Sequence, residues 1–195
     1  KYYALAEICF NEEGLAEIAH QFSWAISAKL GRRKKCLVLD LDNVLWGGLL
    51  GDGPVQLNPG RGFGRVHYEL QLAIKQLAST GVILAICSKN NEKETLEFIE
   101  NDPNMVLRLK GFAAWRINWE PKYKNIKSIA EELNIGLESM VFLDDSRNEV
   151  AEIRELLPEV TTPHLNWFQE TLAHDFNALP YFDTFRLTDE DVRRG

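Results

Sequence analysis

The sequence predicts an α/β fold in which helices cover a parallel central sheet. Three short apolar runs, at 36–40, 82–87 and 140–143, have the length and composition of buried strands. Segments whose apolar residues recur at helical spacing separate these runs along the chain. Because strands that alternate with helices pair in parallel through crossover connections, the three runs should form one layered sheet.

The first expected element is a helix over 12–30. Apolar residues recur there at helical spacing, and Gly31 ends the pattern. We expect residues 1–31 to form a helical preface and residues 32–195 to form the main domain. Since the chain opens at Lys1 in the middle of a pattern, we also expect it to be cut from a longer polypeptide.

Turn-forming residues follow the first strand. Between Trp46 and Gly64 the sequence is rich in glycine, which predicts a small flap and a loop. The remaining expected elements are helices and one further extended segment. The helices are predicted at about 66–79, 90–100, 121–133 and 148–157, and the extended segment at 112–119.

Composition and charge exclude several classes of function. The 22 basic and 29 acidic side chains give a net charge of −7, which argues against a protein that binds nucleic acid by neutralising phosphates. No apolar run is long enough to cross a bilayer, and the N-terminus has no signal-peptide pattern. Three cysteines, two of them within apolar runs, do not fit a disulfide framework. We therefore expect a cytoplasmic protein that binds neither nucleic acid nor a membrane.

Polar side chains follow the predicted strands directly. The carboxyl ends of parallel strands meet at one edge of a sheet, where α/β proteins bind their ligands. The residues at these ends are Asp40 and Asp42, Ser88 and Lys89, and Asp144 and Asp145. Four carboxylates at one edge repel each other unless a cation lies among them, and an all-oxygen set suits Mg²⁺. The sequence therefore predicts all four aspartates as metal ligands and Mg²⁺ as the cofactor.

The same set of groups is typical of phosphoryl transfer. One carboxylate attacks phosphorus, another exchanges a proton with the leaving group, and cations neutralise the phosphoryl oxygens. Lys122 stands in the first turn of a helix, from which its ammonium can reach a phosphate, whereas Lys124 lies about 200° around that helix. N–H groups at the start of the helix near Asn90 can also hold phosphoryl oxygens. The predicted phosphate-binding residues are Ser88, Lys89, Asn90 and Lys122.

The order of these motifs resembles that of the haloacid dehalogenase (HAD) superfamily. The segments that are similar to its four motifs are Asp40-Leu41-Asp42-Asn43-Val44, Ser88, Lys122 and Asp144-Asp145. The resemblance implies a Rossmann-like, three-layer catalytic domain over 32–195. It also implies that Asp40 is the nucleophile that forms an aspartyl-phosphate and that Asp42 is the general acid/base. Val44 stands where the motif usually has Thr.

Longer stretches resemble one family of that superfamily, the FkbH-like proteins, over most of residues 14–195. The similar stretches are 35–43 with 45–48, 85–91, 117–122, and 133–136 with 141–145. The resemblance implies transfer of a glyceryl unit, derived from 1,3-bisphosphoglycerate, to the phosphopantetheine thiol of an acyl carrier protein, with loss of phosphate. Such a transfer loads starter or extender units in polyketide biosynthesis. The implied partners are a phosphoglycerate-type donor, a phosphopantetheinylated acyl carrier protein and the other domains of a larger synthase.

The spacing of the motifs leaves no room for a large cap domain. Only a flap and one helix fit between Asp42 and Ser88, and only one helix and an extended segment fit between Ser88 and Lys122. An uncapped crevice admits a pantetheine arm that is carried by another protein. It suits a phosphatase that acts on a macromolecule equally well.

Acyl transfer adds two sets of candidate residues. Cys87, next to Ser88, is a candidate acyl-carrying nucleophile, because a phosphate and Mg²⁺ site could stabilise its thiolate. The alternative is a core position, if strand alternation turns Cys87 away from Ser88. Arg61 and Arg65, after the flap, are candidates for the second phosphate of a bisphosphorylated donor, with a solvated surface position as the alternative.

Two other functions stay open on the sequence alone. A plain HAD phosphatase would release phosphate without any carrier protein. A receiver-like module would accept a phosphoryl group on Asp40 and signal through its conformation without being an enzyme. The variant Asp42→Asn separates these cases, because it should abolish an enzyme's turnover but leave a receiver's long-lived phosphorylation intact.

Overall fold

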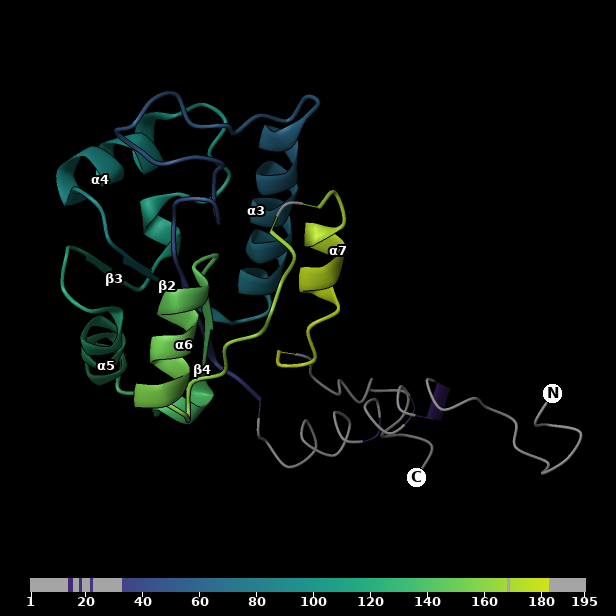
Figure 1. Cartoon of the computed structure of the whole chain (residues 1–195), viewed down its shortest axis with the longest axis vertical. Helices are drawn as coiled ribbons and strands as arrows, with labels where there is room; N and C mark the ends of the chain where they lie inside the picture. Colours follow the sequence, from purple (N-terminus) through teal and green to yellow (C-terminus); the bar gives the residue numbers. More distant parts are fainter. Residues whose placement is uncertain (1–13, 16–17, 19–21, 23–32, 168, 183–195) are drawn as a thin grey trace, which may run out of the picture. The chain divides into compact units, whose positions relative to one another are not determined.

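Four parallel strands form the central sheet, in the order β3-β2-β1-β4 (Figure 1). The strands are β1 (Cys36–Leu39), β2 (Ile83–Ser88), β3 (Ala114–Ile117) and β4 (Met140–Leu143). All three predicted apolar strands are present, and β3 lies within the predicted extended segment at 112–119. Every residue of β1 and β4 is buried, which explains their purely apolar composition. The predicted α/β fold with a parallel sheet is confirmed.

The computed structural model describes residues 14–15, 18, 22, 33–167 and 169–182. Within it, Lys34–Phe182 form one compact unit. The helix predicted over 12–30 lies largely outside the described residues, so the division into a preface and a main domain stays a prediction. No described helix combines the length and the apolar character that a membrane span requires.

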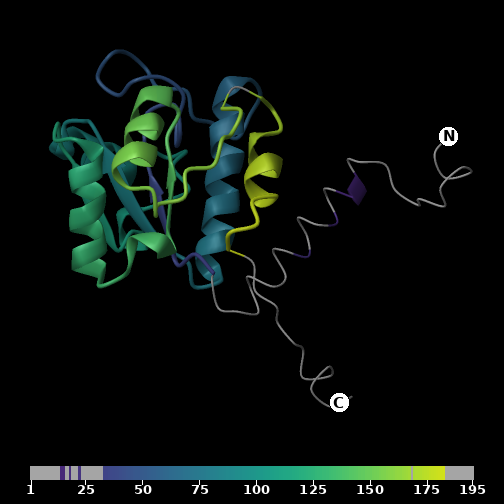
Figure 2. The ribbon, with the colours of Figure 1, turned by 60° about the horizontal axis from the view of Figure 1, so that its bottom comes forward.

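Helices cover both faces of the sheet, as a three-layer fold requires. One layer holds α3 (Phe63–Ser79), α4 (Glu92–Asn101) and α7 (Leu172–Asn177), and the other holds α5 (Lys122–Leu133) and α6 (Arg147–Leu156). Figure 2 shows the sheet between the two layers. Two short 3₁₀ helices lie at Leu109–Gly111 and Leu137–Ser139. The helices predicted at 66–79, 90–100, 121–133 and 148–157 are present as α3, α4, α5 and α6, whereas α7 has no counterpart among the predictions.

Alternation along the strands divides the core in two. Leu37 and Leu39 face the layer of α3, α4 and α7, and Val38 faces α5 and α6. Ile86 and Ala85 on β2 divide between the two layers in the same way. Each strand therefore contributes side chains to both cores, which keeps the sheet buried on both faces.

The parallel register brings the ends of β1, β2 and β4 to the same level. Leu39 is paired with Ile86 on one side and with Leu143 on the other. The N–H of Asp40 donates to the carbonyl of Leu143 at 2.9 Å. The register thus places Asp40 and Asp144 side by side at the carboxyl edge of the sheet.

Capping side chains start the helices at this edge. Asn91 caps α4 by accepting a hydrogen bond from the N–H of Glu94, and Ser146 caps α6 by accepting one from the N–H of Glu149. Pro121 immediately precedes α5. Because the three helices begin just after β2, β3 and β4, their first turns surround the ends of the strands.

A short flap follows β1 and is closed at its base by two hydrogen bonds. Gly47 and Gln56 each donate an N–H to the carbonyl of the other, at 3.0 and 2.8 Å. Gly48, inside the flap, has a φ of +93°, a conformation that favours glycine. Between β1 and β2 the chain forms this flap, a loop and α3, all of which the structure describes, and no cap domain is inserted there.

The outer side of β4 is paired with a later segment of the chain. The N–H of Phe142 donates to the carbonyl of Thr161 at 2.8 Å, and the N–H of Thr161 donates to the carbonyl of Met140 at 3.1 Å. Val141 and Thr161 form a parallel bridge. The segment after α6 therefore continues the hydrogen-bonded sheet beyond β4.

Gln71 on α3 connects the loop after β1 to the segment before β3. Its side chain is fully buried, and Nε2 donates to the carbonyl of Leu45 at 2.7 Å. Oε1 accepts from the N–H groups of Val106 and Leu107 at 2.9 and 3.1 Å. One amide thus satisfies three backbone groups from two distant segments.

His67, one turn earlier on α3, holds the neighbouring carbonyl group. Its Nδ1 lies 2.9 Å from the carbonyl oxygen of Val44. Burial lowers the pKa of His67, although this hydrogen bond opposes the shift. His67 is therefore a neutral donor that positions the chain just after the Asp40 motif.

We expect Gln71→Leu to lower the free energy of unfolding by at least about 2 kcal/mol. Leucine keeps most of the volume of the side chain but leaves the carbonyl of Leu45 and two N–H groups unpaired in a buried place. Urea unfolding measures the change. Gln76→Leu, at an exposed position on the same helix, should change the free energy by less than about 0.5 kcal/mol. Equal losses in the two variants would contradict this role of Gln71.

Candidate active site

Three carboxylates from two neighbouring strand ends form an acidic cluster. Asp40 follows β1, Asp144 and Asp145 follow β4, and one carboxylate oxygen of each lies within 4.8 Å of the others. Asp40 and Asp144 are buried, and Asp145 is half-buried. Because carboxylate oxygens are the ligands that Mg²⁺ prefers in proteins, these three residues could hold this ion.

Lys122, the first residue of α5, brings a buried positive charge to the cluster. Its Nζ donates to Oδ2 of Asp144 at 2.6 Å and lies 2.9 Å from Oδ1 of Asp40. The second contact is an ion pair without hydrogen-bond geometry, and Oδ1 of Asp40 has no hydrogen-bond partner among the described residues. Burial opposes the charge of Lys122, but the two carboxylates outweigh burial and raise the pKa of this lysine. Lys124, by contrast, is exposed and pairs with Glu120.

One lysine does not balance three carboxylates. Burial and the charge of Asp40 raise the pKa of Asp144 to about 7, although Lys122 opposes the shift. The same two causes raise the pKa of Asp145 above its ordinary value. The cluster thus carries more negative charge than its neighbours compensate, and a divalent cation would relieve the repulsion.

Asp42 is held apart from the acidic cluster by three donors. Oδ1 accepts from the indole N–H of Trp46 at 2.7 Å and from the N–H of Leu50 in the flap at 3.0 Å. Oδ2 accepts from Nδ2 of Asn90 at 3.0 Å. The structure does not place this carboxylate with the other three predicted metal ligands. It lies instead between the flap and the loop after β2.

Two residues that position the loop after β1 are missing from the predicted site. Trp46 is fully buried, and the sequence pattern alone indicates packing rather than a hydrogen bond to Asp42. Asn43 has a φ of +56°, accepts from the N–H of Gly48 at 2.9 Å and donates to Asp145 at 3.1 Å. The sequence did offer a signal for Asn43. Asn is enriched at positive φ, so an Asn directly after the D-x-D motif indicates a turn at that position.

Of the predicted phosphate ligands at the end of β2, Asn90 contacts Asp42, and Ser88 lies next to Asn90. Both are buried, and Nδ2 of Asn90 lies 3.4 Å from Oγ of Ser88. Lys89 instead forms an ion pair with Glu149 of α6 at 2.5 Å, which the sequence did not predict. The ammonium of Lys89 is therefore already compensated by a carboxylate.

Cys87 lies in the apolar core, which corrects its prediction as an acyl-carrying nucleophile. The side chain is fully buried among residues that face α5 and α6, and Sγ donates to the carbonyl of Lys122 at 3.7 Å. Burial raises the pKa of the thiol, and the charge of Lys122 only partly opposes this shift. Strand alternation is the physical reason, because it turns Cys87 away from Ser88. Burial thus encloses the thiol and favours its protonated form, which is a poor nucleophile.

Arg61 and Arg65, predicted to hold a second phosphate, are both exposed. Nε of Arg65 pairs with Glu69, one turn later on α3, at 2.7 Å. Within the described part of the chain, no contact joins either arginine to the acidic cluster. The structure therefore gives these two residues a surface position and does not bring them into the site.

Solved structures provide the comparisons for this chain, since no protein-family model and no curated protein matches it. The chain is similar to the N-terminal part of the protein BF1531 from Bacteroides fragilis, described as containing a phosphatase domain complexed with Mg. The two are 41% identical with a TM-score of 0.89, and the match covers 93% of this chain and 49% of that chain. This chain thus spans about half the length of that structure.

Two more distant structures share the fold. The cobalt-bound deoxy-D-mannose-octulosonate 8-phosphate phosphatase from Haemophilus influenzae is 12% identical, with a TM-score of 0.53, over 76% of this chain and 88% of that chain. A HAD family enzyme from Bacteroides thetaiotaomicron is 15% identical, with a TM-score of 0.50, over 74% of this chain and 98% of that chain. At these identities the comparisons show a common fold.

Proposed function

We propose that this chain is a Mg²⁺-dependent phosphatase that acts on a phosphate monoester. The haloacid dehalogenase (HAD) fold of the similar structures supports this proposal. The observation that carries this proposal is the buried cluster of Asp40, Asp144 and Asp145 with Lys122 at the carboxyl edge of the sheet. The 41% identical structure contains a phosphatase domain complexed with Mg, which supports both the reaction and the cofactor predicted from the sequence.

The residues that would hold Mg²⁺ are the three carboxylates of the acidic cluster. The approach of three carboxylate oxygens to within 4.8 Å of one another and the raised pKa of Asp144 both fit a cation among these oxygens. When bound, the ion supplies positive charge that offsets the phosphoryl oxygens in the transition state. Asp42 keeps its carboxylate out of this set because Trp46, Leu50 and Asn90 hold it elsewhere.

In the first proposed step, a carboxylate oxygen of Asp40 attacks phosphorus. The bond from phosphorus to the leaving oxygen breaks, and that oxygen takes a proton from Asp42. Oδ1 of Asp42 accepts two hydrogen bonds and Oδ2 accepts one, so Oδ2 has more acceptor capacity left for this proton. In the second step, water attacks the aspartyl-phosphate, Asp42 takes the proton of the water, and Asp40 is released with free phosphate.

Three buried polar side chains would hold the transferring group during both steps. Lys122 offsets negative charge from the side of α5, where it already contacts Asp40 and Asp144. Ser88 and Asn90 offer a hydroxyl and an amide N–H from the loop after β2. Because all three are buried, they are oriented before the substrate arrives.

The affinity for Mg²⁺ is expected to fall as the pH drops below about 7. The pKa of Asp144 is raised to about 7, so the carboxylate is increasingly protonated below that pH, and the ion must displace the proton. Each competing proton weakens binding by at most about tenfold per pH unit, and the proton on Asp144 ceases to compete above about pH 7. Calorimetric Mg²⁺ titrations at pH 5.5, 6.5, 7.5 and 8.5 measure this. A constant affinity between pH 5.5 and 7.5 would contradict it.

Phosphate release tests the proposed function. The purified chain is incubated with p-nitrophenyl phosphate and a panel of phosphate monoesters, with Mg²⁺ and with the chelator EDTA in its place. We expect Mg²⁺-dependent release of phosphate that EDTA stops and added Mg²⁺ restores. If Asp40 instead becomes stably phosphorylated and releases no phosphate, the chain is a receiver-like module and the proposal fails.

A second candidate is the transfer of a glyceryl unit to an acyl carrier protein. It is favoured by the FkbH-like stretches and by the absence of an inserted domain between β1 and β2, where an open edge would admit a pantetheine arm. Because Cys87 is enclosed, the acceptor in this reaction would be the thiol of the carrier itself. In that case the thiol sulfur attacks the acyl carbon of the donor, and the acyl phosphate leaves as the thioester forms. The remaining phosphate ester would then be hydrolysed through Asp40, which leaves a glyceryl thioester on the carrier and a second free phosphate.

Intact mass separates the two candidates. A phosphopantetheinylated carrier protein is incubated with the chain, Mg²⁺ and 1,3-bisphosphoglycerate, with Asp40→Asn beside it. A glyceryl mass on the carrier that is lost in the variant would support the transferase. An unmodified carrier with free phosphate in solution would leave the phosphatase as the function.

A further inference from the structure

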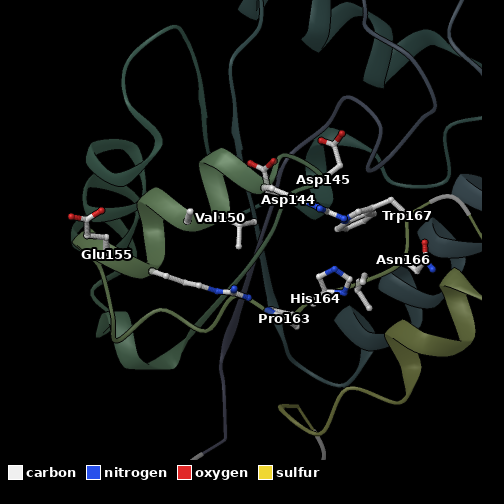
Figure 3. A pocket seen from close by; sticks show the side chains of 12 residues that line it. Asp144, Asp145, Val150, Glu155, Pro163, His164, Asn166 and Trp167 are labelled. Carbon is white, nitrogen blue, oxygen red and sulfur yellow. The ribbon is translucent and has the colours of Figure 1, made fainter.

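A cavity of about 840 Å³ lies beside the acidic cluster, between α6 and the segment 163–167 (Figure 3). Asp144 and Asp145 line one end of it, and Glu155 lies at the opposite end. Cavities of this size hold small molecules in many proteins. Since the cavity shares its lining with the acidic cluster, a substrate whose phosphoryl group lies at Asp40 can extend into it.

One wall of the cavity is a single face of α6. The residues on this face stand at positions i, i+3, i+4 and i+7 of the helix, so they point the same way. They are Arg147, Val150, Ala151 and Arg154. At the rise of an α-helix, the two arginines are separated by about 10 Å along this wall. Arg147 therefore offers positive charge near the acidic cluster, and Arg154 offers it two turns further away, next to the carboxylate of Glu155.

The opposite wall is formed by the segment 163–167. His164 and Asn166 are exposed polar residues, and Trp167, which is 7% exposed, also lines this wall (Figure 3). This wall offers hydrogen-bonding groups and an aromatic surface. No carboxylate from this segment lines the cavity. This wall therefore adds no negative charge that would repel an anion bound between the two arginines.

The two arginines differ in how they are held. Nε of Arg154 donates to Oγ1 of Thr162 and Nη2 donates to the carbonyl of Thr162, both at 2.7 Å, which fixes the guanidinium at the cavity wall. Among the described residues, no hydrogen bond or ion pair involves the guanidinium of Arg147. One cation is therefore oriented in advance, and the other is available to a ligand next to the acidic cluster.

We propose that this cavity binds the leaving group of the substrate, and that the substrate is a phosphate monoester with a second anionic group at its other end. The proposal rests on the proposed phosphatase function. The phosphoryl group lies at Asp40, the carbon chain lies along Val150 and Trp167, and the second anion contacts Arg147 or Arg154. Arg61 and Arg65 take no part in this recognition.

Two matched substrates test the proposal. 6-Phosphogluconate and glucitol 6-phosphate have the same carbon chain, and only the first carries a carboxylate. The ratio of their kcat/KM values is measured for the unchanged chain, for Arg147→Gln and for Arg154→Gln. Lys75→Gln serves as the control, because Lys75 is an exposed lysine of α3 outside the cavity.

We expect the unchanged chain and Lys75→Gln to favour the acidic substrate equally. A lost charged contact should lower this preference roughly 10- to 100-fold in at least one arginine variant. Arg147→Gln is the more decisive variant, because among the described residues the guanidinium of Arg147 makes no hydrogen bond or ion pair that the substitution would remove. A preference that is unchanged in both arginine variants, or absent in the unchanged chain, overturns the proposal.

A binding measurement on an inactive variant tests the anion site independently of the phosphatase function. Calorimetry with Asp40→Asn and Mg²⁺ compares the affinities for 6-phosphogluconate and glucitol 6-phosphate. If no phosphate monoester is hydrolysed by the unchanged chain but the acidic compound still binds more tightly through Arg147, the phosphatase function fails and the anion site stands. If both compounds are hydrolysed and bind equally, the anion site fails and the phosphatase function stands.

Discussion

Asp40→Asn is expected to lower the rate of phosphate release by at least about three orders of magnitude. An amide is not a nucleophile towards phosphorus, and the substitution also removes one carboxylate from the acidic cluster. The Asn side chain keeps the size of Asp, so the buried position beside Lys122 is still filled. Initial rates with p-nitrophenyl phosphate at saturating Mg²⁺ measure the loss.

Asp52→Asn is the matched control for this variant. Asp52 is an exposed residue of the flap, and the same change of charge there should leave the rate within a factor of about two. Thermal unfolding of both variants shows whether they are folded. If folded Asp40→Asn retains more than a tenth of the rate, Asp40 is not the nucleophile.

Lys122→Met is expected to lower the free energy of unfolding by about 3–5 kcal/mol near pH 7 without Mg²⁺. Lys122 is the cation between Asp40 and Asp144, and its side chain is only 4% exposed. Methionine fills the space but leaves two buried carboxylates without this partner. Urea unfolding measures the change, and Mg²⁺ should restore part of the loss because it binds the same carboxylates.

Lys124→Met provides the comparison on the same helix. Lys124 pairs with Glu120 at 3.8 Å on the surface, where such pairs contribute little. Its removal should change the free energy of unfolding by less than about 1 kcal/mol. Similar losses in the two variants would show that the charge of Lys122 is not needed to compensate the cluster.

Much of the fold was predictable because parallel strands restrict how the chain can connect them. Short apolar runs that alternate with helices have few other arrangements, and their carboxyl ends must meet. This is why Asp40, Asp144 and Ser88 come together at one edge of the sheet. Helical periodicity was likewise sufficient to separate Lys122 from Lys124, since residues two positions apart on a helix point about 200° away from each other.

The contacts that hold the loop after β1 were not predictable in this way. Gln71 bonds Leu45 on one side and Val106 on the other, and no local pattern shows that three such distant segments meet. The hydrogen bond from Trp46 to Asp42 depends on how the flap folds back after β1. Such contacts follow from tertiary packing, which spacing and periodicity do not describe.

Side-chain direction explains the other differences from the predicted site. Cys87 and Ser88 are neighbours in the sequence, but consecutive residues of a strand point to opposite faces of the sheet. The sequence alone does not show which of the two side chains points towards α5 and α6, and in the structure it is Cys87. Asp42 follows Asp40 by two residues, yet the chain turns there and its carboxylate finds three other donors. Proximity in sequence therefore overestimated the number of carboxylates that lie together at this edge of the sheet.

The pairing of Thr161 with β4 also bears on how the chain behaves at high concentration. A strand at the edge of a sheet presents unpaired N–H and carbonyl groups, which can template pairing with another molecule. Here Thr161 bonds Phe142 and Met140, so a row of these groups on β4 is covered from within the same chain. The apolar strand that supplies two of the acidic residues is thereby protected against aggregation through edge-to-edge contacts.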